Sequence, residues 1–258
     1  MEIICPICKE KLVKENNSYK CINRHNFDIA KQGYLNLSNK SANKTGDEKE
    51  MVKARDEFLN KDYYLFLRDE LNKIINNLNV TNLLDLACGQ GYYTKSFNVK
   101  DKIGIDLSKE ALKIASKNDK DTTYILKTIF DVPLKEKSID LITTIFAPIS
   151  KQISKLLKKD GYFILVKPDV YHLYELKEAV YDKPYLNEVE DIQIDNLTLI
   201  KEYKIKDIKT LNKDDVIDLF KMTPYYHKTS LKDFNKLENI TKLDITFSFI
   251  IDVYQNKI

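Results

Sequence analysis

The chain has 258 residues, enough for one large domain and a small one; 43% are hydrophobic, 31% are charged, and the formal net charge is +3. This composition excludes an intrinsically disordered chain, which combines low hydrophobicity with high net charge. No apolar run approaches the about 20 residues of a membrane span. The first residues lack a secretory signal pattern, so we expect a cytoplasmic protein without membrane contact.

The first elements in chain order precede any regular alternation. Residues 1–37 are rich in Cys and interrupted by polar turns. Residues 38–50 are polar and nearly lack apolar side chains, which predicts a linker or loop. From Glu48 to Leu78 apolar residues recur at helical spacing, and the pattern breaks near 60–62, so two helices are predicted.

From residue 80 onwards, short apolar strands alternate with amphipathic helices. The predicted strands lie at 82–86, 102–106, 123–127, 139–146 and 161–167, and the predicted helices at 92–98, 108–118 and 149–159. Ser108 has the residue type and position of a helix N-cap. This alternation predicts an α/β fold with a Rossmann-like parallel sheet and helices on both faces.

The last part of the chain has a different pattern. Residues 197–206 and 243–254 have the pattern of longer strands, with a helix between them at 213–221. A long antiparallel hairpin that closes one edge of the sheet is one arrangement that accommodates them.

Three of the four cysteines and one histidine lie in the first 25 residues, as Cys5, Cys8, Cys21 and His25. The spacing C-x2-C-x12-C-x3-H provides two ligand pairs, which a tetrahedral zinc ion requires. The alternative is a set of free thiols and a surface histidine, but a segment this short with few large apolar residues needs a staple to fold. Four protein ligands leave no open position on the metal, so the sequence predicts structural zinc.

The N-terminal segment is also positively charged. Residues 1–46 contain eight Lys or Arg against four Asp or Glu, and three thiolates with one zinc ion leave a charge of about +3. A small positive module joined by a linker to a catalytic domain suggests binding to a polyanion, and the alternative is a purely structural module.

Residues 83–94 have the pattern of a strand, a tight glycine turn and a helix, and include Asp85, Gly89 and Gly91. A dinucleotide turn needs a third glycine where Thr94 stands, and Asp85 would repel a pyrophosphate. A ligand with a positive end fits better, and S-adenosylmethionine carries both a sulfonium and an ammonium group.

Asp106 ends the next predicted strand, 15 residues after Gly91, where a carboxylate can accept both hydroxyls of a ribose. The alternative for this pair of motifs is an ordinary strand turn with a solvent-facing Asp, because short motifs often match by chance.

A series of motifs, in order along nearly the whole chain, resembles the 23S ribosomal RNA (guanine-N1)-methyltransferase family, including its macrolide-resistance branch. The motifs are the Cys5–His25 finger, the run 26–37, Arg55 to Arg68, Asp85 to Thr94, Gly104-Ile105-Asp106, Phe146-Ala147-Pro148, His172 to Lys177, and Met222-Thr223-Pro224. The resemblance implies a class I S-adenosylmethionine-dependent methyltransferase with an N-terminal zinc finger. It further implies a homodimer that methylates a guanine in hairpin 35 of the large-subunit RNA.

The resemblance also assigns cofactor-binding residues. The family's glycine loop maps to Gly89 and Gln90, a Tyr before the domain maps to Tyr64, and a His after the fifth strand maps to His172. The alternatives are a packing role for Tyr64 and a capping or surface role for His172.

The pattern and the resemblance together divide the chain into three parts. A zinc-finger RNA-recognition module is expected at 1–37, a linker with helices at 38–79, and the methyltransferase domain at 80–258.

Guanine N1 carries a proton at neutral pH, so a base or donors to O6 must assist its methylation. The candidate bases are Asp169, at a strand end, and Asp131, near the cofactor loop. Phe146 ends the fourth predicted strand and could stack on the target base; core packing is its alternative role.

Two other functions use the same residues. A methyltransferase for a small molecule would share the fold and the glycine loop, and only the finger and linker argue against it. A non-catalytic RNA-binding protein on a methyltransferase fold would have lost its cofactor residues, yet Asp85, Gly89, Gly91 and Asp106 are all present.

Overall fold

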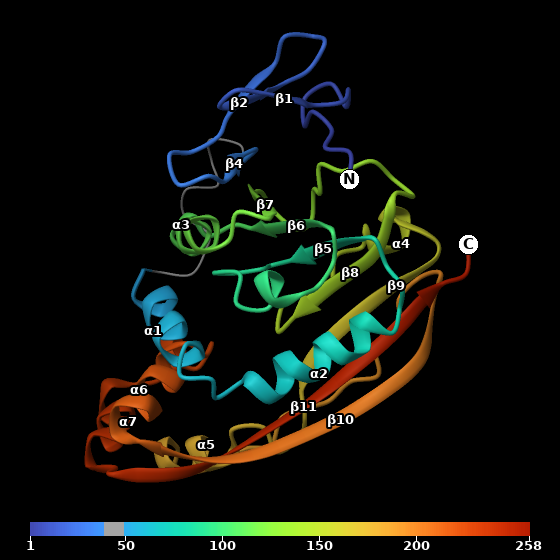
Figure 1. Ribbon diagram of the computed structural model, residues 1–258. Helices are drawn as coiled ribbons and strands as arrows, with labels where there is room; N and C mark the ends of the chain where they lie inside the picture. The colour runs from blue at the N-terminus through green and yellow to red at the C-terminus, as the bar shows by residue number, and fades with distance from the viewer. Residues whose placement is uncertain (39–48) are drawn as a thin grey trace.

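The computed structural model describes residues 1–38 and 49–258, and most of the predicted linker at 38–50 lies outside these residues. One eight-stranded sheet forms its centre, in the order β10-β11-β9-β8-β5-β6-β7-β4 (Figure 1). Its strands are β4 (Leu35–Asn36), β5 (Asn82–Leu86), β6 (Asp101–Asp106), β7 (Thr122–Leu126), β8 (Ile139–Ile145), β9 (Leu157–Pro168), β10 (Leu197–Asn212) and β11 (Lys242–Asn256).

The sheet is mixed. From β4 across to β9 neighbouring strands run parallel, whereas β11 runs antiparallel to β9 and β10 antiparallel to β11. The Rossmann-like sheet is therefore confirmed, and so is the long antiparallel hairpin at its edge. Figure 1 shows this hairpin, β10 and β11, curving along the lower side of the molecule.

The helices are α1 (Lys49–Leu59), α2 (Leu65–Asn76), α3 (Lys109–Asn118), α4 (Ile153–Leu156), α5 (Tyr174–Val180), α6 (Lys213–Lys221) and α7 (Leu231–Phe234), with short 3-10 turns at η2 (Thr94–Ser96), η3 (Tyr226–Lys228) and η4 (Asn235–Asn239). The predicted helices occur in the predicted order, two of them at a different length, and α5 and α7 were not predicted. Ser108 caps α3 as predicted, since its hydroxyl accepts from the backbone N–H of Ala111.

The predicted helices at 92–98 and 149–159 are wrong in length. Only η2 forms in the first, because Phe97 turns into an extended conformation and the Lys102 ammonium satisfies the carbonyls of Thr94 and Phe97. Only α4 forms in the second, because Leu157 already pairs with Ile139 as the start of β9.

Alternate residues of the central strands point into two separate cores. Leu83 and Leu141 belong to one, which contains the buried face of α2; Leu84 and Ile142 belong to the other. The second core is closed by α4 and by N-terminal residues such as Ile3, so the N-terminal module covers part of this sheet face.

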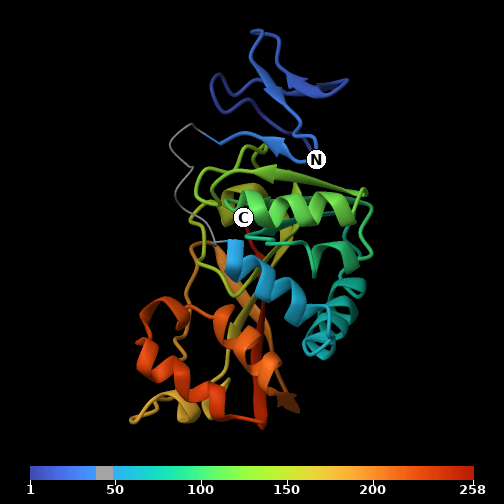
Figure 2. The same ribbon diagram turned by 90° about the vertical axis from the view of Figure 1, so that its left-hand side faces the viewer.

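The N-terminal module has its own small sheet of β1 (Val13–Glu15), β2 (Ser18–Lys20) and β3 (Asn26–Asp28). It is joined to the main body by the bridge between Ile3 and Leu134 and by β4, which pairs in parallel with β7. Figure 2 shows the module at one end of the molecule and the α5–α7 region at the other. The exact domain limits stay a prediction.

Candidate functional site

A cavity of about 840 Å³ opens at the carboxyl ends of the parallel strands β5, β6, β8 and β9. Such strand ends are where open α/β sheets bind their ligands. Of the seven residues predicted to bind the cofactor, six line the cavity, namely Tyr64, Asp85, Gly89, Gln90, Asp106 and His172. Gly91, the seventh, lies in the same bend.

The bend after β5 has three residues in the left-handed backbone region, Ala87 at φ +60°, Gly89 at φ +54° and Gly91 at φ +76°. A Cβ on Gly91 would lie 2.5 Å from the Tyr124 hydroxyl, so this position excludes a side chain. At Gly89 nothing lies within 4 Å of such a Cβ, which leaves the backbone open to a ligand in the cavity.

The carboxylate of Asp106 holds this bend in place. One oxygen accepts from the backbone N–H of Gly89 at 2.8 Å, and the other accepts from the backbone N–H of Ser108 at 2.7 Å. Asp106 therefore joins the glycine bend to the start of α3 at the cavity wall.

Asp85 is 3% exposed at the end of β5. Its carboxylate accepts from the hydroxyls of Thr143, at 2.8 Å, and Thr94. Burial raises the pKa of Asp85 to about 6 and the negative charge of Asp106 adds to the shift, while the two threonine hydroxyls oppose it. A cation in the cavity would favour the charged carboxylate.

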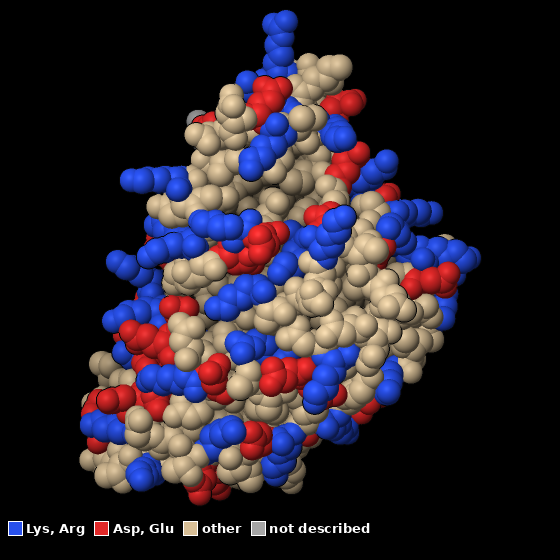
Figure 3. Space-filling view, viewed as in Figure 1, with Lys and Arg blue, Asp and Glu red and all other residues tan. Residues whose placement is uncertain are grey.

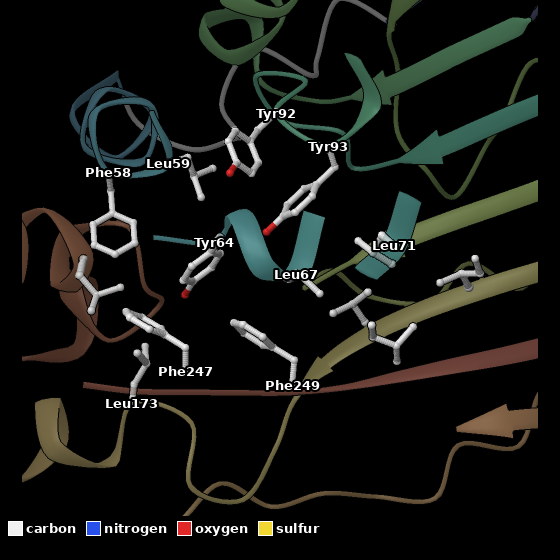
Figure 4. Packing of buried hydrophobic residues seen from close by; sticks show 14 of the residues in the cluster. Phe58, Leu59, Tyr64, Leu67, Leu71, Tyr92, Tyr93, Leu173, Phe247 and Phe249 are labelled. Atoms are coloured by element: carbon white, nitrogen blue, oxygen red, sulfur yellow. The ribbon is translucent and has the colours of Figure 1, made fainter. Parts of the chain in front are cut away.

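Tyr64 lies immediately before α2 and is 3% exposed. Its ring packs edge-on against Phe247 and Phe249, each with centroids 5.2 Å away, and edge-on against Phe146 with centroids 6.2 Å apart. Figure 4 shows Tyr64 between α2 and these two phenylalanines of β11. Tyr64 therefore has the packing role and also lines the cavity, and its contact with the cofactor stays a prediction.

His172 lies in the turn after β9 and is buried, 4.5 Å from the Phe249 ring. Its Nδ1 accepts from the backbone N–H of Ser248 at 3.3 Å. Burial, aided by the positive charge of Lys177, lowers the pKa of His172 to about 3 against the opposing effect of Asp169, so the ring is neutral at pH 7. The neutral ring then carries its proton on Nε2 and is a donor to the cavity.

Sequence reasoning missed a network that holds this turn. The amide of Asn187 donates to the carbonyls of Asp169 and His172, and accepts from the Lys177 ammonium at 2.6 Å. Lys177 is 1% exposed and also lies 4.2 Å over the ring of Tyr185. Asn187 sits in a segment without regular structure, so no periodic signal marks it.

The two candidate bases do not line the cavity. Asp169 stands between two lining residues, Pro168 and His172, and its carboxylate accepts from the hydroxyl of Ser248 at 2.9 Å. Asp131 forms an ion pair with Lys127 at 2.6 Å, and this contact lowers the pKa of the Asp131 carboxyl, which makes it a weaker base.

The N-terminal module brings its four candidate ligands together. The ligand atoms of Cys5, Cys8, Cys21 and His25 all lie within 4.8 Å of one another. The Cys8 and Cys21 sulfurs are 3.6 Å apart, and the Cys21 sulfur is 3.4 Å from Nδ1 of His25. Tetrahedral zinc, with bonds of about 2.3 Å to sulfur and 2.0 Å to nitrogen, separates its ligand atoms by about 3.5–3.8 Å, so the residues fit the ion.

Comparisons with known proteins agree with this geometry. Residues 3–38 match a family model described as "RlmA, N-terminal", a zinc ribbon, and residues 78–221 match one described as a methyltransferase domain. The chain belongs to the methyltransferase domain family. Its fold is that of the class I methyltransferases, which use S-adenosylmethionine, and it carries a zinc ribbon at its N-terminus.

Individual relatives of this methyltransferase are distant. YxjB of Bacillus subtilis, provisionally named a 23S rRNA (guanine-N1)-methyltransferase, is 27% identical and covers 94% of this chain and 93% of its own. The 23S rRNA (guanine(748)-N1)-methyltransferase of Streptomyces fradiae is 26% identical over 68% of this chain and 66% of its own. The solved YcgJ protein of Bacillus subtilis is 16% identical, with a TM-score of 0.47, over 73% of this chain and 98% of its own.

The cavity of the methyltransferase has the chemistry that its cofactor requires. Gln90 Nε2 and the hydroxyls of Tyr92 and Tyr93 are buried, and none has a hydrogen-bond partner among the described residues. All three residues line the cavity. Because buried polar atoms are normally paired, these donors together with the Asp85 carboxylate fit a polar, charged cofactor.

The surface of the methyltransferase carries both signs of charge. Figure 3 shows Lys and Arg side chains interspersed with Asp and Glu over one face, including the end that holds the zinc ribbon. In the part of the chain that the structure describes, no helix is both long and apolar enough to cross a membrane.

Proposed function

We propose that this protein methylates N1 of a guanine in 23S ribosomal RNA, in the loop of hairpin 35 of domain II. The observation that carries the proposal is a zinc ribbon of the type described as "RlmA, N-terminal" on the same chain as a methyltransferase domain. The names of the Bacillus and Streptomyces relatives support the choice of RNA and of the N1 atom.

Different residues of the cavity suit different parts of the cofactor. Asp85 and Asp106 place carboxylates at the ends of β5 and β6, which suits the positive end and the ribose of the cofactor. Gly89 and Gln90 supply backbone at close range, and Tyr64 and His172 also line the cavity. When bound, S-adenosylmethionine supplies a methyl group on a sulfonium, which is a good leaving group.

Phe146 is the residue that we propose to contact the target base. It directly follows β8, lines the cavity and is 41% exposed. Its φ of +58° is a conformation that an aromatic residue adopts at a cost of about 1–2 kcal/mol. Strain of this kind is retained where it serves a site. The exposed ring offers a stacking face for a guanine that has left its own stack.

Removal of the N1 proton requires an acceptor. We retain Asp169 as the first candidate and Asp131 as the second, because Asp169 adjoins two cavity-lining residues whereas Asp131 is engaged with Lys127. The Nε2–H of neutral His172 is a donor that binds the cofactor or supports the charge on O6.

The zinc ribbon at 1–37 serves as the RNA-recognition module, 38–79 as the connecting segment and 80–258 as the methyltransferase domain. Two chains form a homodimer whose ribbons hold the RNA, and the ribosomal substrate implies a cytoplasmic location. Light scattering on the purified chain measures the dimer directly.

The deciding experiment is methylation mapping of 23S RNA. Ribosomal RNA from cells with and without the protein is examined by primer extension, since a methyl group at N1 stops reverse transcriptase, and the fragment is identified by mass. We expect one stop in hairpin 35 that depends on the protein. Activity on a small metabolite with no mark on the RNA would instead support the small-molecule alternative.

A further inference from the structure

The cavity has a cluster of donors that no part of the proposed function uses. The hydroxyls of Tyr92 and Tyr93 are buried without a hydrogen-bond partner in the described residues, and the two side chains are 4% and 9% exposed. Both side chains line the cavity. Figure 4 shows Tyr93 extending from the glycine bend towards Tyr64, and Tyr92 extending towards Leu59.

These hydroxyls remain donors at neutral pH. Burial raises the pKa of Tyr92 to about 12, and burial also raises the pKa of Tyr93 well above its ordinary value. A protonated phenol in a dry site donates one strong hydrogen bond, and a negatively charged acceptor forms the strongest one.

Positive charge lies on the same side of the cavity. Arg55 lines it and donates from its guanidinium to the carbonyl of Met222, another lining residue, at 3.3 Å, and the Arg68 guanidinium lies 4.9 Å over the Tyr92 ring. The chain has only three arginines, and these are two of them. This side therefore favours an anion, whereas the strand ends with Asp85 and Asp106 favour a cation.

The two kinds of charge lie close together. Thr94, the neighbour of Tyr93 in the chain, donates to the Asp85 carboxylate, and the charge of Asp85 acts on the Tyr93 hydroxyl. A carboxylate that attracts a cation therefore lies next to hydroxyls that donate to an anion. This arrangement matches an α-amino acid, whose ammonium and carboxylate groups are bonded to one carbon atom.

We infer that Tyr93, assisted by Tyr92 and Arg55, binds the α-carboxylate of the cofactor's amino-acid end, while Asp85 binds the ammonium. The inference rests on the assignment of this cavity to S-adenosylmethionine. It explains why two tyrosine hydroxyls are left without a protein partner in a well-packed wall. It also makes the site selective for a free amino acid end.

The test is calorimetric binding to the full-length, zinc-loaded protein and uses two ligands. S-adenosylhomocysteine carries the amino-acid end, and 5′-methylthioadenosine lacks it. For Tyr93→Phe we expect the affinity for S-adenosylhomocysteine to fall by about tenfold or more, because a charge-assisted hydrogen bond is lost. The affinity for 5′-methylthioadenosine should stay within about twofold, which is far less than the tenfold that such a bond represents.

Tyr203→Phe, on β10 outside the cavity, is the matched control, and both of its affinities should equal those of the unmodified protein. Tyr92→Phe is the second variant if Tyr93→Phe does not fold. We expect it to lose affinity selectively for S-adenosylhomocysteine, but less strongly, because its ring still contacts Arg68.

Three outcomes overturn the inference. Equal losses for both ligands would make Tyr93 a packing residue only. An unchanged S-adenosylhomocysteine affinity together with weaker binding of a 23S hairpin would assign the hydroxyl to an RNA phosphate. If the unmodified protein binds neither ligand, the cavity assignment fails as well, so that failure is distinguishable from the failure of Tyr93 alone.

Discussion

At the scale of single residues, Asp85 combines a cost to stability with a gain in binding. Its folded pKa of about 6 lies above the ordinary value for Asp, so the native state binds the proton more tightly than the unfolded state. Stability therefore falls as pH rises through the interval from about 4 to 6, and at pH 7 the protein carries a buried charge. A bound cation compensates that charge.

Because the cationic cofactor prefers the ionised carboxylate, its affinity should be constant above about pH 7 and should weaken by up to about tenfold per unit below pH 6. Calorimetry from pH 5 to 8 measures this. In Asp85→Asn the binding should be weak and independent of pH, while the free energy of unfolding at pH 7 should rise by about 1–2 kcal/mol. A flat profile in the unmodified protein would contradict the assignment.

Two glycines of the bend should respond differently to a methyl group. Gly91→Ala places Cβ against the Tyr124 hydroxyl at 2.5 Å, and we expect a loss of about 2–4 kcal/mol in urea unfolding. Gly89→Ala meets no atom within 4 Å and should lose about 1 kcal/mol from backbone strain alone. Combining Gly91→Ala with Tyr124→Phe should recover part of the loss; no recovery would mean that the backbone angle, not the contact, is the cause.

Asp169 has a direct test as well. If its carboxylate accepts the N1 proton, Asp169→Asn should reduce the methylation rate by about a hundredfold or more, with cofactor affinity and thermal stability close to normal. Asp131→Asn tests the second candidate base in the same assay, and we expect a smaller loss of rate because Asp131 pairs with Lys127 and does not line the cavity. Near-normal turnover in Asp169→Asn would remove it as the base.

At the scale of elements, the turn after β9 depends on a segment that has no helix or strand. Asn187 ties this segment to the carbonyls of Asp169 and His172, and Lys177 on α5 holds Asn187 in turn. The hydrogen bond from Ser248 on β11 then sets the ring of His172. Three elements therefore decide the orientation of one cavity residue.

We expect Asn187→Ala to weaken cofactor binding several-fold and to lower the free energy of unfolding by about 1–3 kcal/mol, because two carbonyls lose a donor and the Lys177 ammonium keeps, among the described residues, only the Tyr185 carbonyl as a hydrogen-bond acceptor. Calorimetry and urea titration measure the two effects. Glu188→Ala, the exposed neighbour, is the control and should change neither. If Asn187→Ala lowers stability alone, the network supports the fold and not the site.

At the scale of the whole molecule, the zinc ribbon and the cofactor cavity are separate in space. No residue from 1–38 lines the cavity, although Ile3 and Cys5 pack into the same core as strand residues of the sheet. Loss of zinc should therefore affect RNA binding more than cofactor binding.

Removal of zinc by a chelator should release one ion per chain, abolish binding to the 23S hairpin and lower the melting temperature, because the ribbon loses its staple. Affinity for S-adenosylhomocysteine should change by less than the effect on RNA, since the cavity walls come from residues 55–225. Cys8→Ser should reproduce the result without a chelator. Equal loss of both affinities would show that the ribbon supports the whole fold.

Much of this protein follows from the sequence by local rules. The alternation of apolar residues predicts the strands of the sheet, the cysteine spacing predicts the zinc ligands, and the glycine turn with Asp85 and Asp106 predicts where the cavity opens. These features depend on a few neighbouring residues, so the chain itself determines them.

The remaining features were decided only by the tertiary structure. The helix predicted at 149–159 yields to β9 because Leu157 gains more by pairing with the sheet. The partners of Asn187, the unpaired hydroxyl of Tyr93 and the exposure of Phe146 arise from segments far apart in the chain. Whether a residue is buried or hydrogen-bonded depends on what packs against it in space. The sequence predicts this only where apolar residues recur at the spacing of a helix or a strand.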